Sequence, residues 1–276
     1  MIELANFHSD EWVMEQIHRH YEEAKKRYPE ERILGVFCQG STNYGLDTPN
    51  SDIDTKCIVV PSFEEIALNK KLVSTTHILN NDEHLDAKDI RLYIECFYKQ
   101  NLNFLEILFT PYFILNPAYK KQWDRLVAKR EDIAHMDPVR AVRSMAGMCG
   151  EKHHALQHPY PSKLELLAKY GYDPKQLSHQ ERVKEALRRY IAGEPYYNCV
   201  MEPCNPEYYK WLKCNAMPVE EAVALSNSSL AEVKAMETEF VNTHTPGCNP
   251  EMMAFLKQVQ CDIMRVALSF EFIPRA

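Results

Sequence analysis

The residues with the clearest chemical potential are two acids, Asp52 and Asp54, separated by Ile53. Alternate side chains of a β-strand project from the same face, so we expect the two carboxylates to lie together and Ile53 to point the opposite way. Neighbouring carboxylates repel each other, and a divalent cation removes that repulsion. Mg²⁺ prefers carboxylate oxygens and keeps waters and substrate phosphates as further ligands. The pair therefore predicts a magnesium site, with Mn²⁺ as an alternative ion.

A turn of small residues precedes the acidic pair. The apolar run at 33–39 ends in Gly40 and Ser41, which indicates a buried strand that enters a tight turn. A glycine lets the backbone approach a phosphate closely, and a hydroxyl with exposed N–H groups can hold the phosphate oxygens. Phosphate cradle and metal ligands are therefore expected on adjacent strands.

A third carboxylate is expected from a neighbouring strand. Asp86 is the first choice because it lies between the apolar residues Leu85 and Ala87. Asp89 is the competitor, although it stands where a helix begins and has an N-cap role open to it, and Glu83 is a weaker candidate. Three carboxylates would hold two Mg²⁺ ions about 4 Å apart, around the attacking and leaving oxygens of an in-line displacement.

The elements that must position these groups fall into two halves. Hydrophobic spacing and turn residues predict helix, strands and helix in the first half, an α+β pattern. The expected helices lie at 10–27, 62–68, from 89 and at 103–110, and the expected strands at 33–39, 51–61, 70–80 and 83–88.

No strand is expected after about residue 117, where the pattern becomes helical. The expected helices are 117–130, 137–156, 162–170, 174–192, 206–215, 218–225, 228–241 and 249–270. We therefore predict an α+β fold, a mixed sheet with flanking helices at 1–115 followed by an all-helical domain at 116–276 that closes the nucleotide cleft.

These motifs resemble the nucleotidyltransferase superfamily of DNA polymerase beta and kanamycin nucleotidyltransferase. The segment GSTNYGLDTPNSDIDTKCIVVP is similar to a bacterial and phage branch with the pattern GS-x-x-YG followed by SD-x-D, some members of which are linked to RNA repair. The segments at 89–111 and 170–183 resemble two further motifs of that branch. The resemblance implies transfer of a nucleoside monophosphate from a nucleoside triphosphate, and it adds Tyr44 to the expected nucleotide-binding residues.

The third motif also has a physical interpretation. Lys175, His179 and Arg182 are spaced i, i+4, i+7 and share one face of the expected helix, with Asp173 as its cap and Pro174 at its first position. A basic stripe facing the acidic strands would bind the triphosphate, for which Arg is suited as a two-pronged donor. The alternative is a solvated helix face whose cations pair with Glu181 and Glu185.

Composition limits the partners. The net charge of −7 argues against wholesale nonspecific binding of nucleic acid. The start lacks the pattern of a signal peptide, no stretch is apolar enough to span a membrane, and the nine cysteines have no paired spacing, so we expect a cytoplasmic protein. ATP is the favoured nucleotide. The acceptor stays open among an RNA end or tRNA, a protein hydroxyl and a small molecule, and a catalytically inactive regulatory module is the rival.

Overall fold

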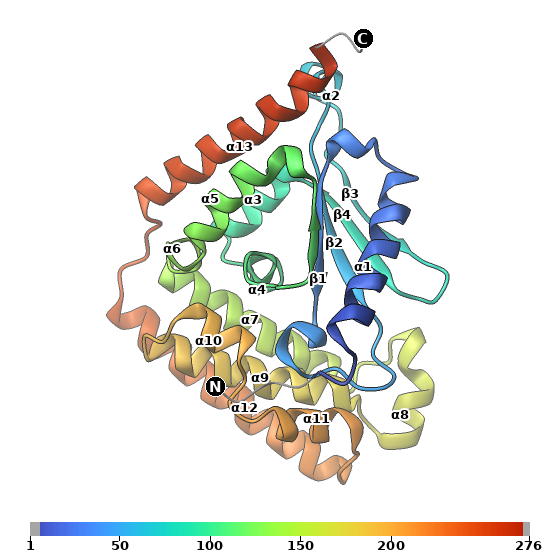
Figure 1. Cartoon of the computed structure of the whole chain (residues 1–276). Coiled ribbons are helices and arrows are strands. Elements are labelled where there is room, and N and C mark those ends of the chain that lie inside the picture. Colours follow the sequence, from blue (N-terminus) through green and yellow to red (C-terminus); the bar gives the residue numbers. More distant parts are fainter. Residues whose placement is uncertain (1–5, 273–276) are drawn as a thin grey trace. The chain divides into compact units, whose positions relative to one another are not determined.

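The computed structural model describes residues 6–272, which form two compact units (Figure 1). We call the first the sheet unit, made of residues 6–43, 47–136 and 248–272, and the second the helical unit, made of residues 44–46 and 137–247. The limits of these compact units do not coincide with the expected division between residues 115 and 116. The segment that follows residue 115 and the last long helix both belong with the sheet.

The sheet has five strands in the order β3-β4-β2-β1-β5. Their bounds are β1 Ile33–Gln39, β2 Asp54–Val59, β3 Ser74–Ile78, β4 His84–Asp89 and β5 Phe113–Leu115. β2 runs parallel to β4, and the other neighbouring pairs are antiparallel. The short edge strand β5 was not anticipated from the sequence.

One face of the sheet is covered by helix α1 (Asp10–Lys25), which begins at the cap residue Ser9 as the sequence indicated (Figure 1). Alternate strand residues point into this layer and form a core with the apolar stripe of the helix. The core includes Val13, Ile17, Ala24, Val36, Cys38, Ile53, Cys57, Leu85 and Ala87. Side chains at the intervening strand positions therefore project from the opposite face.

The opposite face carries α3 (Ile90–Tyr98), α4 (Leu102–Leu105), α5 (Lys120–Ala128) and α13 (Pro250–Phe272) (Figure 1). The rings of Phe37 on β1 and Trp123 on α5 lie 4.4 Å apart. Helix α13 is fastened to this layer by an ion pair of 2.7 Å between Arg125 and Asp262 and by the hydroxyl of Tyr98, which donates to the carbonyl of Met253. This mixed sheet between helices, followed by further helices, confirms the expected α+β class.

The helical unit is built around α9. Its main helices are α7 Pro138–Ala155, α8 Leu164–Tyr170, α9 Pro174–Ile191, α10 Tyr196–Met201, α11 Pro206–Cys214 and α12 Val219–Thr243. Leu156, Tyr172, Leu177 and Leu212 form one of its buried clusters. Helices α7, α11 and α12 all pack on α9.

Two expectations for this unit were wrong. The segments 218–225 and 228–241, expected as two helices, belong to the single helix α12 (Val219–Thr243), which continues through the serines between them. Ser226 is fully buried and donates to the amide oxygen of Gln180 at 2.5 Å, so its hydroxyl does not compete with the helix backbone. The short helix α10 was not anticipated, because its aromatic and proline-rich sequence gives little helical periodicity.

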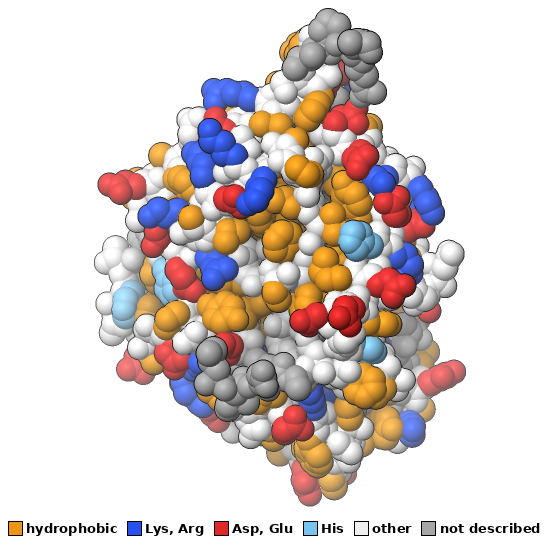
Figure 2. Space-filling model, viewed as in Figure 1, with side chains coloured by type: hydrophobic (Ala, Val, Ile, Leu, Met, Phe, Trp, Pro, Cys, Tyr) orange, Lys and Arg blue, Asp and Glu red, His pale blue; other side chains and the backbone are white. Residues whose placement is uncertain are grey.

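The surface carries mixed charge. Acidic and basic side chains are interspersed over the face shown in Figure 2. Among residues 6–272, no helix combines the length and apolar character needed to cross a bilayer.

Candidate active site

The turn after β1 has the backbone form that the sequence indicated. Gly40 has a φ of +90°, a conformation that residues with a Cβ atom rarely adopt. A Cβ atom there would meet nothing within 4 Å, so the glycine is required by conformation rather than by space. The partly exposed Ser41 follows at the start of a short 3-10 helix, Ser41–Tyr44.

Buried side chains hold this turn in place. The side-chain amide of Asn43 donates to the carbonyl of Cys38 at 3.0 Å, and its oxygen accepts from the hydroxyl of Thr110 at 2.6 Å. Asp47 accepts from the backbone N–H groups of Phe7 and His8, both at 2.9 Å. The turn and the loop after it are thus tied to the sheet unit at both ends.

The acidic pair lies where this loop enters β2. Ile53 is buried in the core under α1, whereas Asp52 is exposed and Asp54 is the first residue of the strand. Asp54 therefore projects from the face opposite α1. Its Oδ1 accepts from the backbone N–H of His84 at 2.9 Å and lies 3.0 Å from Nδ1 of the same histidine.

Asp86 does not lie opposite Asp54. In the parallel pairing of β2 with β4, Asp86 is aligned with Lys56, and His84 precedes it by two residues on the same face. The Asp86 carboxylate lies 2.8 Å from the ammonium of Lys88 and 3.3 Å from that of Lys56. Although burial alone would raise the pKa of Asp86, the two lysines lower it. The role of Asp86 as a metal ligand stays a prediction. In the structure, the negative charge of its carboxylate is already compensated by the two lysines.

Lys56 is the partner that sequence reasoning missed. Its side chain is 5% exposed, and its ammonium lies 4.2 Å from the centroid of the Phe104 ring. Burial lowers the pKa of Lys56, and the Asp86 carboxylate opposes that shift. The signal was available in the sequence, because Lys56 stands two residues after Asp54 and therefore shares its face.

The two competitors for the third acid have other partners. Asp89 caps α3 by accepting from the N–H of Arg91 at 2.8 Å, the N-cap role open to it. Glu83 is buried beside His20 and Arg19 of α1, with its carboxylate 2.9 Å from Nε2 of His20. Both carboxylates are therefore engaged in holding helices.

Asp52 and Asp54 offer carboxylate ligands for a divalent ion. Among residues 6–272, no three His, Cys, Asp or Glu side chains form a ready-made metal cluster. Two carboxylates and substrate phosphates nevertheless suffice for Mg²⁺, which rarely uses an all-protein cage. Asp52 is exposed, and Oδ2 of Asp54 has no hydrogen-bond partner in the described part of the chain. The donor set therefore fits an ion shared with a polyphosphate.

The expected basic helix exists as α9, with Asp173 as its cap and Pro174 in its first turn. The guanidinium carbon of Arg182 lies 3.9 Å from the centroid of the Tyr44 ring, so two of the expected nucleotide-binding residues are in contact within the helical unit. The alternative acidic partners are occupied elsewhere: Glu181 contacts Lys184 and Ser229, and Glu185 contacts Arg189 and Tyr209.

Cations gather around His179. Burial and the positive charges of Arg182, Lys175, Lys152 and Lys213, in that order, hold the pKa of His179 well below its usual value. Lys152 comes from α7 and Lys213 from α11, so three packed helices contribute to this group. We call Lys152, Lys175, Arg182 and Lys213 the cation cluster. Sequence reasoning missed two of its members, because helix packing rather than spacing brings them there.

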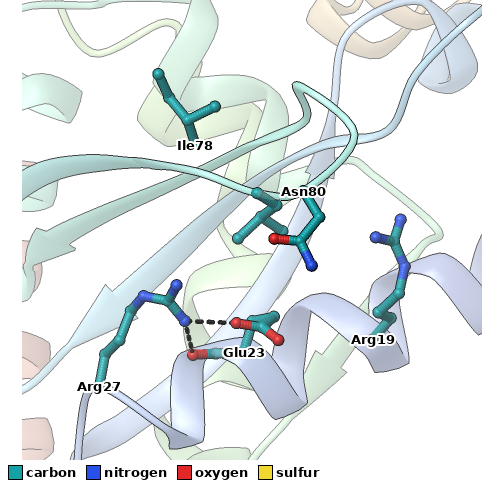
Figure 3. A pocket seen from close by; sticks show the side chains of 6 residues that line it. Arg19, Glu23, Arg27, Ile78 and Asn80 are labelled. Carbon is teal, nitrogen blue, oxygen red and sulfur yellow. Dashed lines mark hydrogen bonds and ion pairs between the residues drawn. The ribbon is translucent and has the colours of Figure 1, made fainter.

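A pocket on the α1 side of the sheet does not belong to this site. It has a volume of about 110 Å³ and is lined by residues of α1, of the segment just after it and of the β3–β4 hairpin, namely Arg19, Glu23, Arg27, Ile78, Leu79 and Asn80 (Figure 3). Arg27 donates to the carboxylate of Glu23 at 2.7 Å, which neutralises its charge. Asp54 projects from the opposite face of the sheet, so this pocket is separate from the acidic pair.

Comparison with known proteins bears on this geometry. A family model described as RlaP, the RNA repair pathway DNA polymerase beta family, matches residues 10–158, which include the turn, the acidic pair and all five strands. The chain belongs to the RNA repair pathway DNA polymerase beta family. That membership confirms the expected resemblance to polymerase beta-like nucleotidyltransferases.

Other comparisons add little to the family assignment. A nucleotidyltransferase-like protein from Exiguobacterium sibiricum is 12% identical, with 92% of this chain and 89% of that chain covered at a TM-score of 0.28. No curated protein matches at a significant level.

Proposed function

We propose that this protein is a divalent-metal-dependent nucleotidyltransferase that transfers a nucleoside monophosphate, most readily from ATP, to a hydroxyl at an RNA end with release of pyrophosphate. The observation that carries the proposal is the succession of a positive-φ glycine turn, the exposed Asp52 and the partly buried Asp54 that begins β2, in a member of this family. RNA is favoured as acceptor because the family description refers to RNA repair.

In the sheet unit, the acids and the glycine turn would have separate roles, in binding the ion and in binding a phosphate. Asp52 and Asp54 would hold the ion, while Gly40 and Ser41 would receive a phosphate through backbone N–H groups and the hydroxyl. A divalent ion bound there neutralises phosphate charge and lowers the pKa of the acceptor hydroxyl, and two ions would serve both the attacking and the leaving oxygen. Ile53, buried in the core under α1, directs Asp54 to the opposite face of the sheet.

The residues of the helical unit would bind the anionic part of the nucleotide. The cation cluster supplies four positive charges around a histidine held neutral, which favours a polyphosphate. Arg182 can donate to phosphate in two-pronged fashion, and Tyr44 orients it by stacking.

Radiolabelled ATP with Mg²⁺ and RNA bearing a free 3′-hydroxyl tests the proposal. Label should enter RNA, with pyrophosphate as co-product, and Asp54→Asn should reduce the rate at least about 100-fold, because metal stabilisation of several kcal/mol is lost. Asparagine keeps an oxygen that can accept from His84, so the fold should survive.

Asp82→Asn is the matched control, because Asp82 lies in the β3–β4 turn with a φ of +63°, which asparagine tolerates. Labelled protein or small molecules without labelled RNA would contradict the RNA acceptor. Metal-dependent nucleotide binding without transfer to any acceptor would contradict the enzyme and favour a regulatory module.

A further inference from the structure

The place beside Asp54 at which a third carboxylate was expected is occupied by an imidazole. Strand register aligns Asp86 with Lys56, two residues further along, and leaves His84 opposite Asp54. Two contacts of 2.9 and 3.0 Å, one from the backbone and one from the ring, join His84 to the same carboxylate oxygen. The His84 side chain is 44% exposed, so the ring is accessible from solvent.

We propose that His84 is a ligand of the divalent ion held by Asp54, and that Asp86 instead holds Lys56 and Lys88. This inference rests on the proposed function, because it concerns the same metal site. A neutral imidazole is a common metal ligand through either ring nitrogen, and Nδ1 is the nitrogen that faces Asp54.

The separation of the two donor atoms fits a shared ion. Neighbouring ligands of an octahedral ion with bonds of about 2.1 Å lie about 3 Å apart. The Asp54 Oδ1 and His84 Nδ1 atoms are separated by 3.0 Å. An ion bonded to both atoms would lie to one side of the line that joins them, so the exposed His84 ring would turn toward the ion while both strands keep their places.

The surroundings of Asp86 favour the second half of the inference. Its two oxygens face the ammonium groups of Lys88 and Lys56, and Oδ1 also accepts from Thr76 at 3.3 Å. A second divalent ion at Asp86 would stand beside two positive charges. The compensated carboxylate thus keeps a buried lysine in place on the strand that carries Asp54.

A nitrogen ligand changes the ion that the site prefers. Imidazole and carboxylate together suit Mn²⁺ and later transition ions better than Mg²⁺, for which oxygen ligands are preferred. The protein should therefore bind Mn²⁺ more tightly than Mg²⁺. His84→Ala should weaken Mn²⁺ binding roughly 10- to 100-fold, the loss usual for groups that support a metal site, and Mg²⁺ binding less.

Pulsed electron paramagnetic resonance of the Mn²⁺-loaded protein with tripolyphosphate, which contains no nitrogen, tests this directly. Wild type should show nitrogen coupling that changes when histidine carries a ¹⁵N-labelled ring. The coupling should disappear in His84→Ala and His84→Asp and persist in Asp86→Asn. His18→Ala, at an exposed position of α1, is the matched control. Circular dichroism verifies the fold of each variant.

Each result decides a separate point. Mn²⁺ binding that depends on Asp54 but shows no nitrogen coupling would overturn the His84 inference and leave the proposed function standing. Loss of Mn²⁺ binding in folded Asp86→Asn would restore Asp86 as the ligand. No Mn²⁺ binding with tripolyphosphate, in wild type or any variant, would overturn both proposals.

Discussion

Two charged regions of the protein differ in how their charges are balanced: the face of β2 and β4 that carries Asp54, and the cation cluster. On the strands Asp54 is hydrogen-bonded by His84, and the charge of Asp86 is compensated by two lysines within the fold. Around His179 the four cations have the same sign, and they act on the histidine by lowering its pKa. Accumulated like charge destabilises a fold, and binding an anion relieves it. The first region is held by its own ion pairs. The cation cluster also has contacts of its own, such as that of Lys152 with Glu151 at 3.0 Å, yet its four cations together suit an anionic ligand.

The largest change in stability should follow from removing the negative charge of Asp86 on the strands. Asp86→Asn leaves the Lys56 ammonium buried beside Lys88 without a counter-charge, so unfolding free energy should fall by about 3 kcal/mol. Urea unfolding in EDTA, which excludes any contribution of metal, measures it.

The control for that experiment is the double variant Lys56→Met, Asp86→Asn. Removing both charges should recover much of the lost stability, because methionine fills a similar volume beside Phe104. A double variant as unstable as Asp86→Asn would show that packing, rather than the ion pair, governs this face.

In the cation cluster, removal of a charge should weaken ligand binding without destabilising the fold. Lys175→Ala should raise the dissociation constant for tripolyphosphate about tenfold, equivalent to about 1.4 kcal/mol, with unchanged or improved stability. Calorimetric titration measures the affinity, with Lys234→Ala on exposed α12 as control. Equal affinities in the two variants would mean that the cluster does not bind polyphosphate.

The smallest change in stability should come from lowering the pH. The pKa of His179 is depressed in the folded protein, so the unfolded chain binds the extra proton more readily. The histidine contribution to stability is therefore complete above about pH 6.5 and is lost as pH falls below that value, by at most about 1.4 kcal/mol per pH unit.

Unfolding at pH 7 and pH 5.5 should show a steeper loss of stability for wild type than for His179→Gln. Tripolyphosphate should reduce the difference by compensating the surrounding cations. Identical pH dependence in the two proteins would show that the pKa of His179 is the same in the folded and the unfolded protein.

The sequence was most informative where local pattern decides structure. Gly40 followed by Ser41, the alternation around Ile53, and Asp173 with Pro174 each depend on a few neighbouring residues, and the structure has the expected turn, burial and helix start. These signals also sufficed for the fold class and the family.

What the sequence could not supply was register. Asp86 was chosen for its apolar neighbours, yet a shift of two residues between β2 and β4 decides whether Asp86 or His84 faces Asp54. Likewise, Lys152 and Lys213 reach His179 only through the packing of α7 and α11 on α9. Such placement depends on contacts far apart in the chain, which no local pattern encodes.

The position of helix α13 near the end of the chain has a consequence for folding during synthesis. The sheet unit contains residues 6–43 and 47–136, yet it also needs residues 250–272, whose side chains contact Arg125 and whose backbone accepts from Tyr98. A ribosome releases the amino-terminal segment first, so the apolar sides of α3 and α5 stay uncovered until α13 emerges. Nascent chains stalled before residue 250 should therefore engage chaperones that chains carrying α13 do not need.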